Sequence, residues 1–156
     1  MSAAHGTRSS SPARASWERF AAEAPALAEA VRARFAAHRH HIIGTLRADG
    51  APRLSGTEVQ VDGGQIRIGM MPDSHKLRDV RRDPRVEIHS APLEEDLAGG
   101  DAKVAGRARE IHVPMEQPGA LFAIDIERVS LVRVAGDELE FSIWRPDRGL
   151  RTIRRQ

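Results

Sequence analysis

The chain has 156 residues, 40% of them hydrophobic, which is enough for one compact domain with a real core. Its 24 basic and 22 acidic residues nearly balance, which argues against a dedicated nucleic-acid binder. It has no cysteine, so disulfides, thiolate nucleophiles and cysteine-based metal sites are excluded. No apolar run approaches the ~18 residues of a membrane span. We therefore expect a cytoplasmic protein that binds neither nucleic acid nor a membrane.

The N-terminal part of the chain divides into two segments. Residues 1–15 are small and polar, and we expect them to form a disordered tail. Residues 16–40 are predicted to be helical, with Ser16 as the first cap. Because Pro25 interrupts the pattern, we expect a short helix, a break, and a second helix that ends near His38.

Residues 41–147 change to the alternating pattern of short strands joined by tight turns. The strands are predicted at 42–46, 53–61, 65–71, 85–90, 103–112, 121–134 and 138–144. Because closure removes exposed strand edges, the economical arrangement is an antiparallel barrel of six to seven strands. The expected fold class is thus mainly β with flanking helices. Residues 92–100 are predicted to be an acidic loop, and residues 148–156 a basic C-terminal tail.

One short predicted helix, Ser74 to Arg82, has the features of an anion site. Ser74 is a good N-cap, and the start of a helix offers free amides and the positive end of the dipole. Lys76 has the wrong charge for this position and costs ~0.3–1 kcal/mol, a cost that a bound anion removes. The alternative is that Lys76 is a solvated surface charge. The preceding Gly69 favours a site, because it lets a ligand approach the backbone.

The segment IRIGMMPDSHKLRDV at residues 66–80, with RRDPRV after it, resembles a known strand-loop-helix. It is similar to that of the pyridoxamine 5'-phosphate oxidase-like, FMN-binding split-barrel superfamily. Residues 44–53 resemble the first hairpin of the same family, and the resemblance covers residues 38–145. It implies a split β-barrel over residues 41–147 that binds a flavin. It also implies a homodimer whose cofactor groove is built from two chains.

The resemblance implies cofactor contacts from three strands and the short helix. Ser74, His75 and Lys76 fall on the phosphate-binding positions, with His75 in place of the usual arginine. In the vitamin oxidases an arginine and a lysine stand where this chain has Ser55 and Gln60, so the vitamin is not the expected substrate. Trp144 has two interpretations, cofactor contact or core packing. The predicted cofactor-binding residues are Ser55, Gly56, Thr57, Gly69, Met70, Met71, Ser74, His75, Lys76 and Trp144.

The function that the resemblance implies is a flavin-dependent oxidoreductase that uses FMN to act on a small-molecule substrate. No protein nucleophile or acid–base pair stands out, so the catalytic residues stay unassigned and the cofactor carries the chemistry. The alternative cofactor is an 8-hydroxy-5-deazaflavin, whose acidic tail would suit Arg148 and Arg151. Two further alternatives are a non-catalytic flavin-binding protein and a haem-binding split barrel that uses His89 or His112. No metal site is expected.

Overall fold

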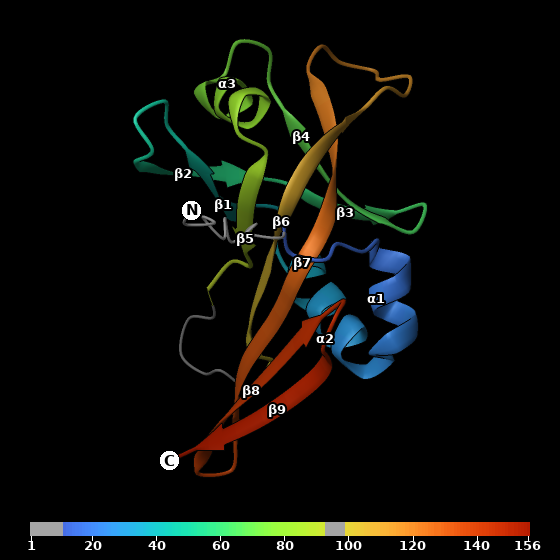
Figure 1. Ribbon diagram of the computed structural model, residues 1–156, viewed down its shortest axis with the longest axis vertical. Helices are drawn as coiled ribbons and strands as arrows, with labels where there is room; N and C mark the ends of the chain where they lie inside the picture. Colours follow the sequence, from blue (N-terminus) through green and yellow to red (C-terminus); the bar gives the residue numbers. More distant parts are fainter. Residues whose placement is uncertain (1–10, 93–98) are drawn as a thin grey trace, which may run out of the picture.

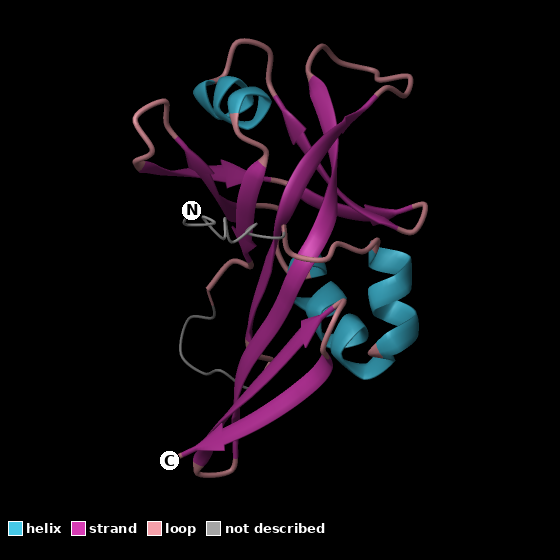
Figure 2. Ribbon diagram, viewed as in Figure 1, coloured by secondary structure: helices cyan, strands magenta, loops and turns pink. Residues whose placement is uncertain are grey.

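The structure is a computed structural model that describes residues 11–92 and 99–156. Its helices are α1 (Trp17–Glu23), α2 (Pro25–Ala36) and α3 (His75–Arg82). Its strands are β1 (His41–Leu46), β2 (Pro52–Thr57), β3 (Val59–Asp62), β4 (Gln65–Met70), β5 (Arg85–His89), β6 (Asp101–Ile111), β7 (Ala120–Ala135), β8 (Glu138–Arg145) and β9 (Gly149–Arg155). The predicted class, mainly β with flanking helices, is confirmed (Figures 1 and 2). No helix in the described ranges is long and apolar enough to cross a membrane.

The barrel is closed by a single bent segment of the chain. Seven strands follow one another in the order β2-β1-β5-β6-β7-β4-β3, and every pairing is antiparallel. The two strands at the ends of this path, β2 and β3, are separated in sequence only by Glu58. The sequence predicted residues 53–61 as one strand, but its halves pair with different partners, β1 and β4. This segment therefore joins the two edges of the sheet.

The C-terminal strands extend beyond the barrel as an arm. The long strand β7 continues past it and pairs with β8, and β8 pairs with β9. The residues predicted to be a basic tail instead form β9, from Gly149 opposite Arg145 to Arg155 opposite Leu139. Most of the predicted acidic loop and of the predicted N-terminal tail, residues 93–98 and 1–10, lies outside the described residues.

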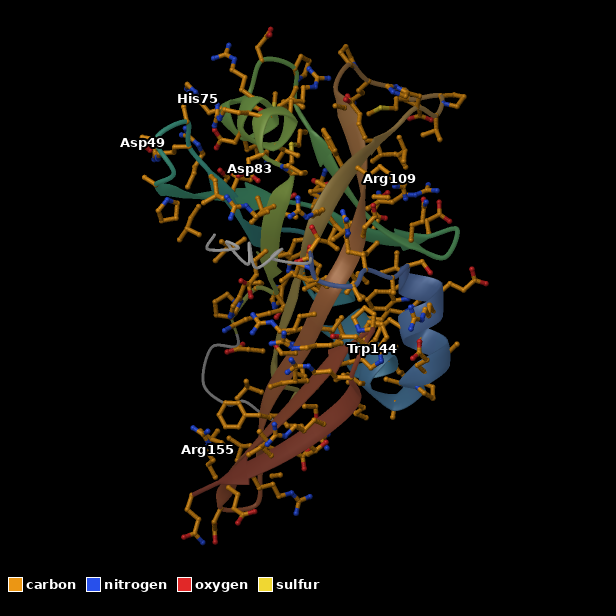
Figure 3. All side chains as sticks on the ribbon, in the orientation of Figure 1. Asp49, His75, Asp83, Arg109, Trp144 and Arg155 are labelled. Atoms are coloured by element: carbon orange, nitrogen blue, oxygen red, sulfur yellow. The ribbon has the colours of Figure 1, made fainter. Side chains whose placement is uncertain are left out.

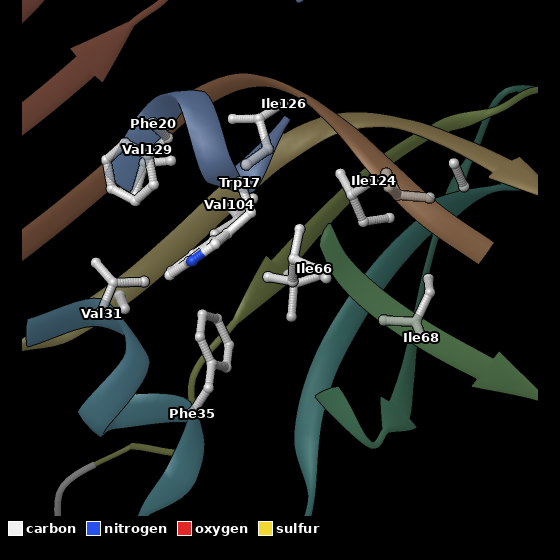
Figure 4. Packing of buried hydrophobic residues seen from close by; sticks show 14 of the residues in the cluster. Trp17, Phe20, Val31, Phe35, Ile66, Ile68, Val104, Ile124, Ile126 and Val129 are labelled. Atoms are coloured by element: carbon white, nitrogen blue, oxygen red, sulfur yellow. The ribbon is translucent and has the colours of Figure 1, made fainter. Parts of the chain in front are cut away.

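The core contains a cluster of large buried side chains where α1 and α2 lie against the sheet (Figure 4). The Ser16 hydroxyl caps α1 by accepting a hydrogen bond from the Arg19 amide at 3.1 Å, and α2 begins at Pro25, as the sequence predicted. The ring of Phe20 lies 5.1 Å from that of Trp17 and 5.0 Å from that of Trp144. These aromatic rings join α1 to β8. The opposite end of the barrel, by contrast, bears α3.

Candidate functional site

Helix α3 is held against the barrel by one buried carboxylate, Asp79. This carboxylate accepts hydrogen bonds from the Thr45 hydroxyl of β1 at 2.8 Å and from Arg53 of β2 at 2.7 Å. Arg82 adds a bond at 2.9 Å from within α3. Burial raises the pKa of Asp79, but the bonds from Arg53, Thr45 and Arg82 outweigh it, and the pKa lies below its usual value. The charged network thus fixes the position of α3 relative to β1 and β2.

The start of α3 is formed by a tight turn that follows β4. The Met71 carbonyl accepts a bond from the Ser74 amide at 3.3 Å, and Asp73 takes a positive φ of 60°. Ser74 then caps α3, because its hydroxyl accepts a bond from the Leu77 amide at 3.3 Å. The same hydroxyl keeps its own proton free to donate. The predicted cap and helix are therefore present, and the amides of the first turn face away from the helix body.

Beside α3 lies a cleft of about 730 Å³, within the usual size range of small-molecule sites. Its floor is the outward side of the β4 end, centred on Gly69. One wall is formed by Lys76 of α3 and the segment from Gly56 to Gln60, and the other by residues 113–118. Apart from the adjoining residues of the chain, no atom lies within 4 Å of the position that a Cβ atom on Gly69 or Gly56 would occupy, so the floor there is open.

The structure brings together six of the ten predicted site residues. The six that line the cleft are Gly56, Thr57, Gly69, Met70, Met71 and Lys76. Ser55 does not line it, since this residue lies opposite the buried Ile43 in the pairing of β2 with β1. Ser74 and His75 lie at the N-terminus of α3 and do not line the cleft, and His75 is exposed (Figure 3).

Two predicted roles require correction. The side chain of Met70 is 4% exposed and belongs to the core, so Met70 offers backbone rather than a thioether to the cleft. Trp144 is 0% exposed and packs on Phe20, at the opposite end of the barrel from His75 (Figure 3). A side chain with no exposed surface cannot reach a ligand in its own chain or in a second copy. Trp144 is therefore a core residue.

Several residues of the cleft were not predicted from the sequence. They are His40, Glu58, Gln60, Arg67, Leu121 and the segment 113–118. The only local signal for that segment was its pair of prolines, Pro114 and Pro118. Its position beside β4 depends on the pairing of β4 with β7, in which Gly69 lies opposite Leu121. Local pattern does not reveal such a long-range pairing.

Lys76 is the principal cation at the wall nearest α3. Its ammonium donates a hydrogen bond to the Gly56 carbonyl at 2.5 Å, and burial lowers its pKa. Among residues 11–92 and 99–156, no carboxylate forms an ion pair with it. An anion beside this ammonium would offset its partial loss of hydration. Arg148 and Arg151 belong to the C-terminal arm and do not line the cleft.

The chain matches the family model described as pyridoxamine 5'-phosphate oxidase over residues 27–133, and it belongs to that family. Among curated proteins, no sequence matches it. The solved structures add neighbours of the same fold.

PhzG from Burkholderia lata 383, in complex with tetrahydrophenazine-1-carboxylic acid, superposes with a TM-score of 0.64 at 11% identity, over 85% of this chain and 89% of that one. A pyridoxamine 5'-phosphate oxidase-related, FMN-binding protein from Nostoc punctiforme PCC 73102 gives 0.60 at 13% identity, over 85% and 96%. HutZ, a haem storage protein from Vibrio cholerae, gives 0.52 at 16% identity, over 67% and 90%. At these identities the likeness shows the fold alone, and it confirms the split barrel.

The residues of the cleft fit a phosphate-bearing flavin. Lys76 and the first turn of α3 supply the positive charge and free amides that a phosphate needs. The bare backbone at Gly69 and Gly56 leaves space for a flat ring to lie against the floor. The cleft thus has a polar end near α3 and an open floor toward Met71.

Proposed function

We propose that this chain is an FMN-dependent oxidoreductase that binds the cofactor in the cleft beside α3. The observation that carries the proposal is Lys76, a partly buried ammonium that faces the cleft without a carboxylate partner in the described part of the chain. Family membership supports a flavin as the anionic ligand. When bound, FMN would supply hydride or electron transfer.

Each element of the cleft has a separate task in this proposal. Lys76 would hold the phosphate, with the Ser74 hydroxyl and the amides of the first turn of α3 as further donors. His75, exposed beside them, adds charge only when its imidazole is protonated. Gly69 and Gly56 would leave the floor free for the ring, and Thr57 would orient its edge. The Asp79 network keeps the phosphate donors at a fixed position relative to this floor.

We also propose that the protein is a homodimer. The outward face of β1, β2, β5 and β6 has a shallow groove of about 250 Å³, lined by Ile42, Gly44, Leu54, Glu87, His89 and Lys103. Leu54 is 75% exposed there, and the exposure of a large apolar side chain to water is unfavourable in free energy. A second copy would cover this groove. Size-exclusion chromatography with light scattering measures the mass, and a monomer at micromolar concentration would contradict this part of the proposal.

The test of the cofactor site compares FMN with riboflavin, which lacks the phosphate. Arg145 serves as the control cation, because it is exposed at the end of β8 and lines neither the cleft nor the proposed dimer groove. We expect Lys76→Ala to weaken FMN binding about 10- to 100-fold, the value of a charge-assisted hydrogen bond, while riboflavin binding stays nearly constant. Arg145→Ala should change neither. Isothermal titration measures all four affinities, and equal FMN affinity in both variants would show that Lys76 does not hold the phosphate.

The same purified protein separates the alternatives. Flavin, deazaflavin and haem are told apart by absorbance, with bands at ~450 nm, ~420 nm and a Soret band respectively. Titration with FMN, an 8-hydroxy-5-deazaflavin and haemin then ranks their affinities. If no flavin or deazaflavin binds below roughly 100 μM, about −5.5 kcal/mol, the proposed function fails. If FMN binds but is not reduced by any nicotinamide donor, and if the reduced protein passes electrons to no acceptor, the non-catalytic alternative is favoured.

A further inference from the structure

Methionines are concentrated around the cleft. The chain has four, and the three within the described residues, Met70, Met71 and Met115, all line it. Met70 is turned into the core, but Met71 is 75% exposed and Met115 is 44% exposed. These two large apolar side chains therefore stand on the rim of a polar cleft with much of their surface open. Exposed apolar groups gathered at one concave place indicate a binding surface.

The two exposed thioethers come from two separate segments of the chain that line the cleft. Met71 directly follows β4 and the open backbone of Gly69. Met115 lies on the wall formed by residues 113–118, and its terminal methyl carbon lies 3.9 Å from the position that a Cβ atom on Gly119 would occupy. A side chain there would also lie 2.5 Å from the Met70 carbonyl oxygen, so only glycine permits this close approach of the wall to β4.

The wall that bears Met115 is restrained at both ends. Pro114 and Pro118 fix their own backbone angles, which lowers the entropy lost when the segment closes on a ligand. The described lining of the cleft contains no Phe, Tyr or Trp side chain, so apart from the imidazole of His40 a flat molecule would be held by thioethers and aliphatic groups. Methionine is suited to this, because its sulfur is polarizable and its flexible chain adapts to flat rings. The only charge on this wall is the carboxylate of Glu116, which disfavours an anionic ligand.

We infer that Met71 and Met115 border a substrate subsite on the rim of the cleft, which accepts a neutral, planar, apolar ring beside the Gly69 floor. This inference rests on the proposed function, since it names the substrate class for the same cleft. The subsite lies on the rim and is separate from the phosphate donors at α3. It differs in its charge preference from a site that binds a ring carboxylic acid, because Glu116 borders it.

The experiment uses two probes with the same ring and different charge, 9-anthracenemethanol and 9-anthracenecarboxylate. Their affinities are measured by equilibrium dialysis for the full chain, alone and with added FMN. Met71→Gln and Met115→Gln replace each thioether by a polar chain of similar length, and Met71→Leu keeps the apolar character. Leu150→Gln is the matched control, since Leu150 is an exposed apolar residue of β9, outside the cleft.

We expect the wild-type chain with FMN bound, whose phosphate would occupy Lys76, to prefer the neutral probe, and each glutamine variant in the cleft to bind it about three- to tenfold more weakly. Met71→Leu and Leu150→Gln should retain binding of the neutral probe, and FMN affinity should stay unchanged in Met115→Gln and Leu150→Gln. Unchanged binding of the neutral probe in both glutamine variants, or tighter binding of the carboxylate when FMN is bound, would overturn the inference. A change of molecular mass in those variants without a change in probe binding would instead assign the two methionines to a protein interface. Failure of the wild-type chain to bind FMN while it binds the neutral probe would reject the proposed function and leave the apolar subsite standing.

Discussion

The two ends of the barrel use the same strands for opposite purposes. Strand β7 contributes Leu121 to the cleft near its start and Val129 to the fully buried core further on. Near the middle of Figure 1, α1 and α2 cover the sheet, and the rings of Trp17, Phe20 and Trp144 pack together there. At the upper end α3 stands beside an open floor made by glycines. The difference shows that large aromatic side chains fill the region beneath α1, whereas the end that bears α3 leaves backbone and polar donors open to a ligand.

Removing Trp144 tests the packed end and has the largest expected effect. Trp144→Ala should lower the free energy of unfolding by about 3–5 kcal/mol, because it leaves a large cavity beside Phe20. The indole nitrogen of Trp144 is buried without a hydrogen-bond partner among the described residues, so Trp144→Phe should cost much less. Urea unfolding measures both variants.

The same two variants separate the two roles considered for Trp144. If Trp144 belongs only to the packed end, the folded fraction of each variant should bind FMN with wild-type affinity. A loss of FMN affinity in Trp144→Phe, which retains the fold, would restore the interpretation of this residue as a cofactor contact.

Removing Asp79 tests what holds the open end in place. Asp79→Ala leaves Arg53 with no carboxylate at a largely buried site, and we expect a loss of about 3 kcal/mol at pH 7. FMN affinity should also fall, because α3 loses its anchor. Thr45→Val is the milder control, since it removes only the hydroxyl that donates to the same carboxylate. A variant of Asp79 with wild-type stability would show that α3 is held by its apolar contacts alone.

The pH dependence of stability gives a second test of Asp79. Because the folded-state pKa of Asp79 lies below the ordinary 3.8, its stabilisation is fully present above about pH 5 and is lost as the pH falls through the folded-state pKa. The stability difference between wild type and Asp79→Ala, measured by urea unfolding, should therefore narrow as the pH falls below about 5. Asp83, whose pKa the Arg85 side chain lowers to about 2, is present in both proteins, so its own loss cancels in the comparison.

The smallest expected effect concerns the turn between β4 and α3. Asp73 is the only non-glycine residue of the described ranges with a positive φ, at 60°. Asp73→Gly should raise the free energy of unfolding by about 0.5–1 kcal/mol, because glycine adopts this conformation without strain. Asp49→Gly is the control, since Asp49 has an ordinary φ and its carboxylate accepts a bond from the Ala51 amide. A loss of stability in Asp73→Gly would show that its side chain supports the turn.

Local signals in the sequence predicted the elements well and their partners poorly. The cap at Ser74, the break at Pro25 and the stop before Pro84 each depend on neighbouring residues, and all three are present. By contrast, the arginine-rich end resembled a tail because nothing local reveals that the edge of β8 is available to pair with it.

The site shows the same division between local and long-range information. Lys76 and Gly69 were predicted because they belong to one continuous strand-loop-helix. The facing wall with Met115 was missed, because only the pairing of β4 with β7 brings it there. Trp144 was misassigned for a related reason, since an aromatic residue on a strand gives no sign of which end of a barrel it faces.

The bent segment of residues 52–62 also has a consequence for the order of folding. Its two halves pair with their sequence neighbours β1 and β4 in local hairpins, which need only short turns to form. Closing these hairpins into one sheet depends on contacts between residues far apart in sequence, such as Ile42 with His89 and Gly69 with Leu121. Chains dominated by such distant contacts lose conformational entropy on loop closure before the contacts form, and they fold in roughly milliseconds to seconds. Closure of the barrel, and with it the assembly of the cleft floor beside Gly56, is therefore a late event on the folding pathway.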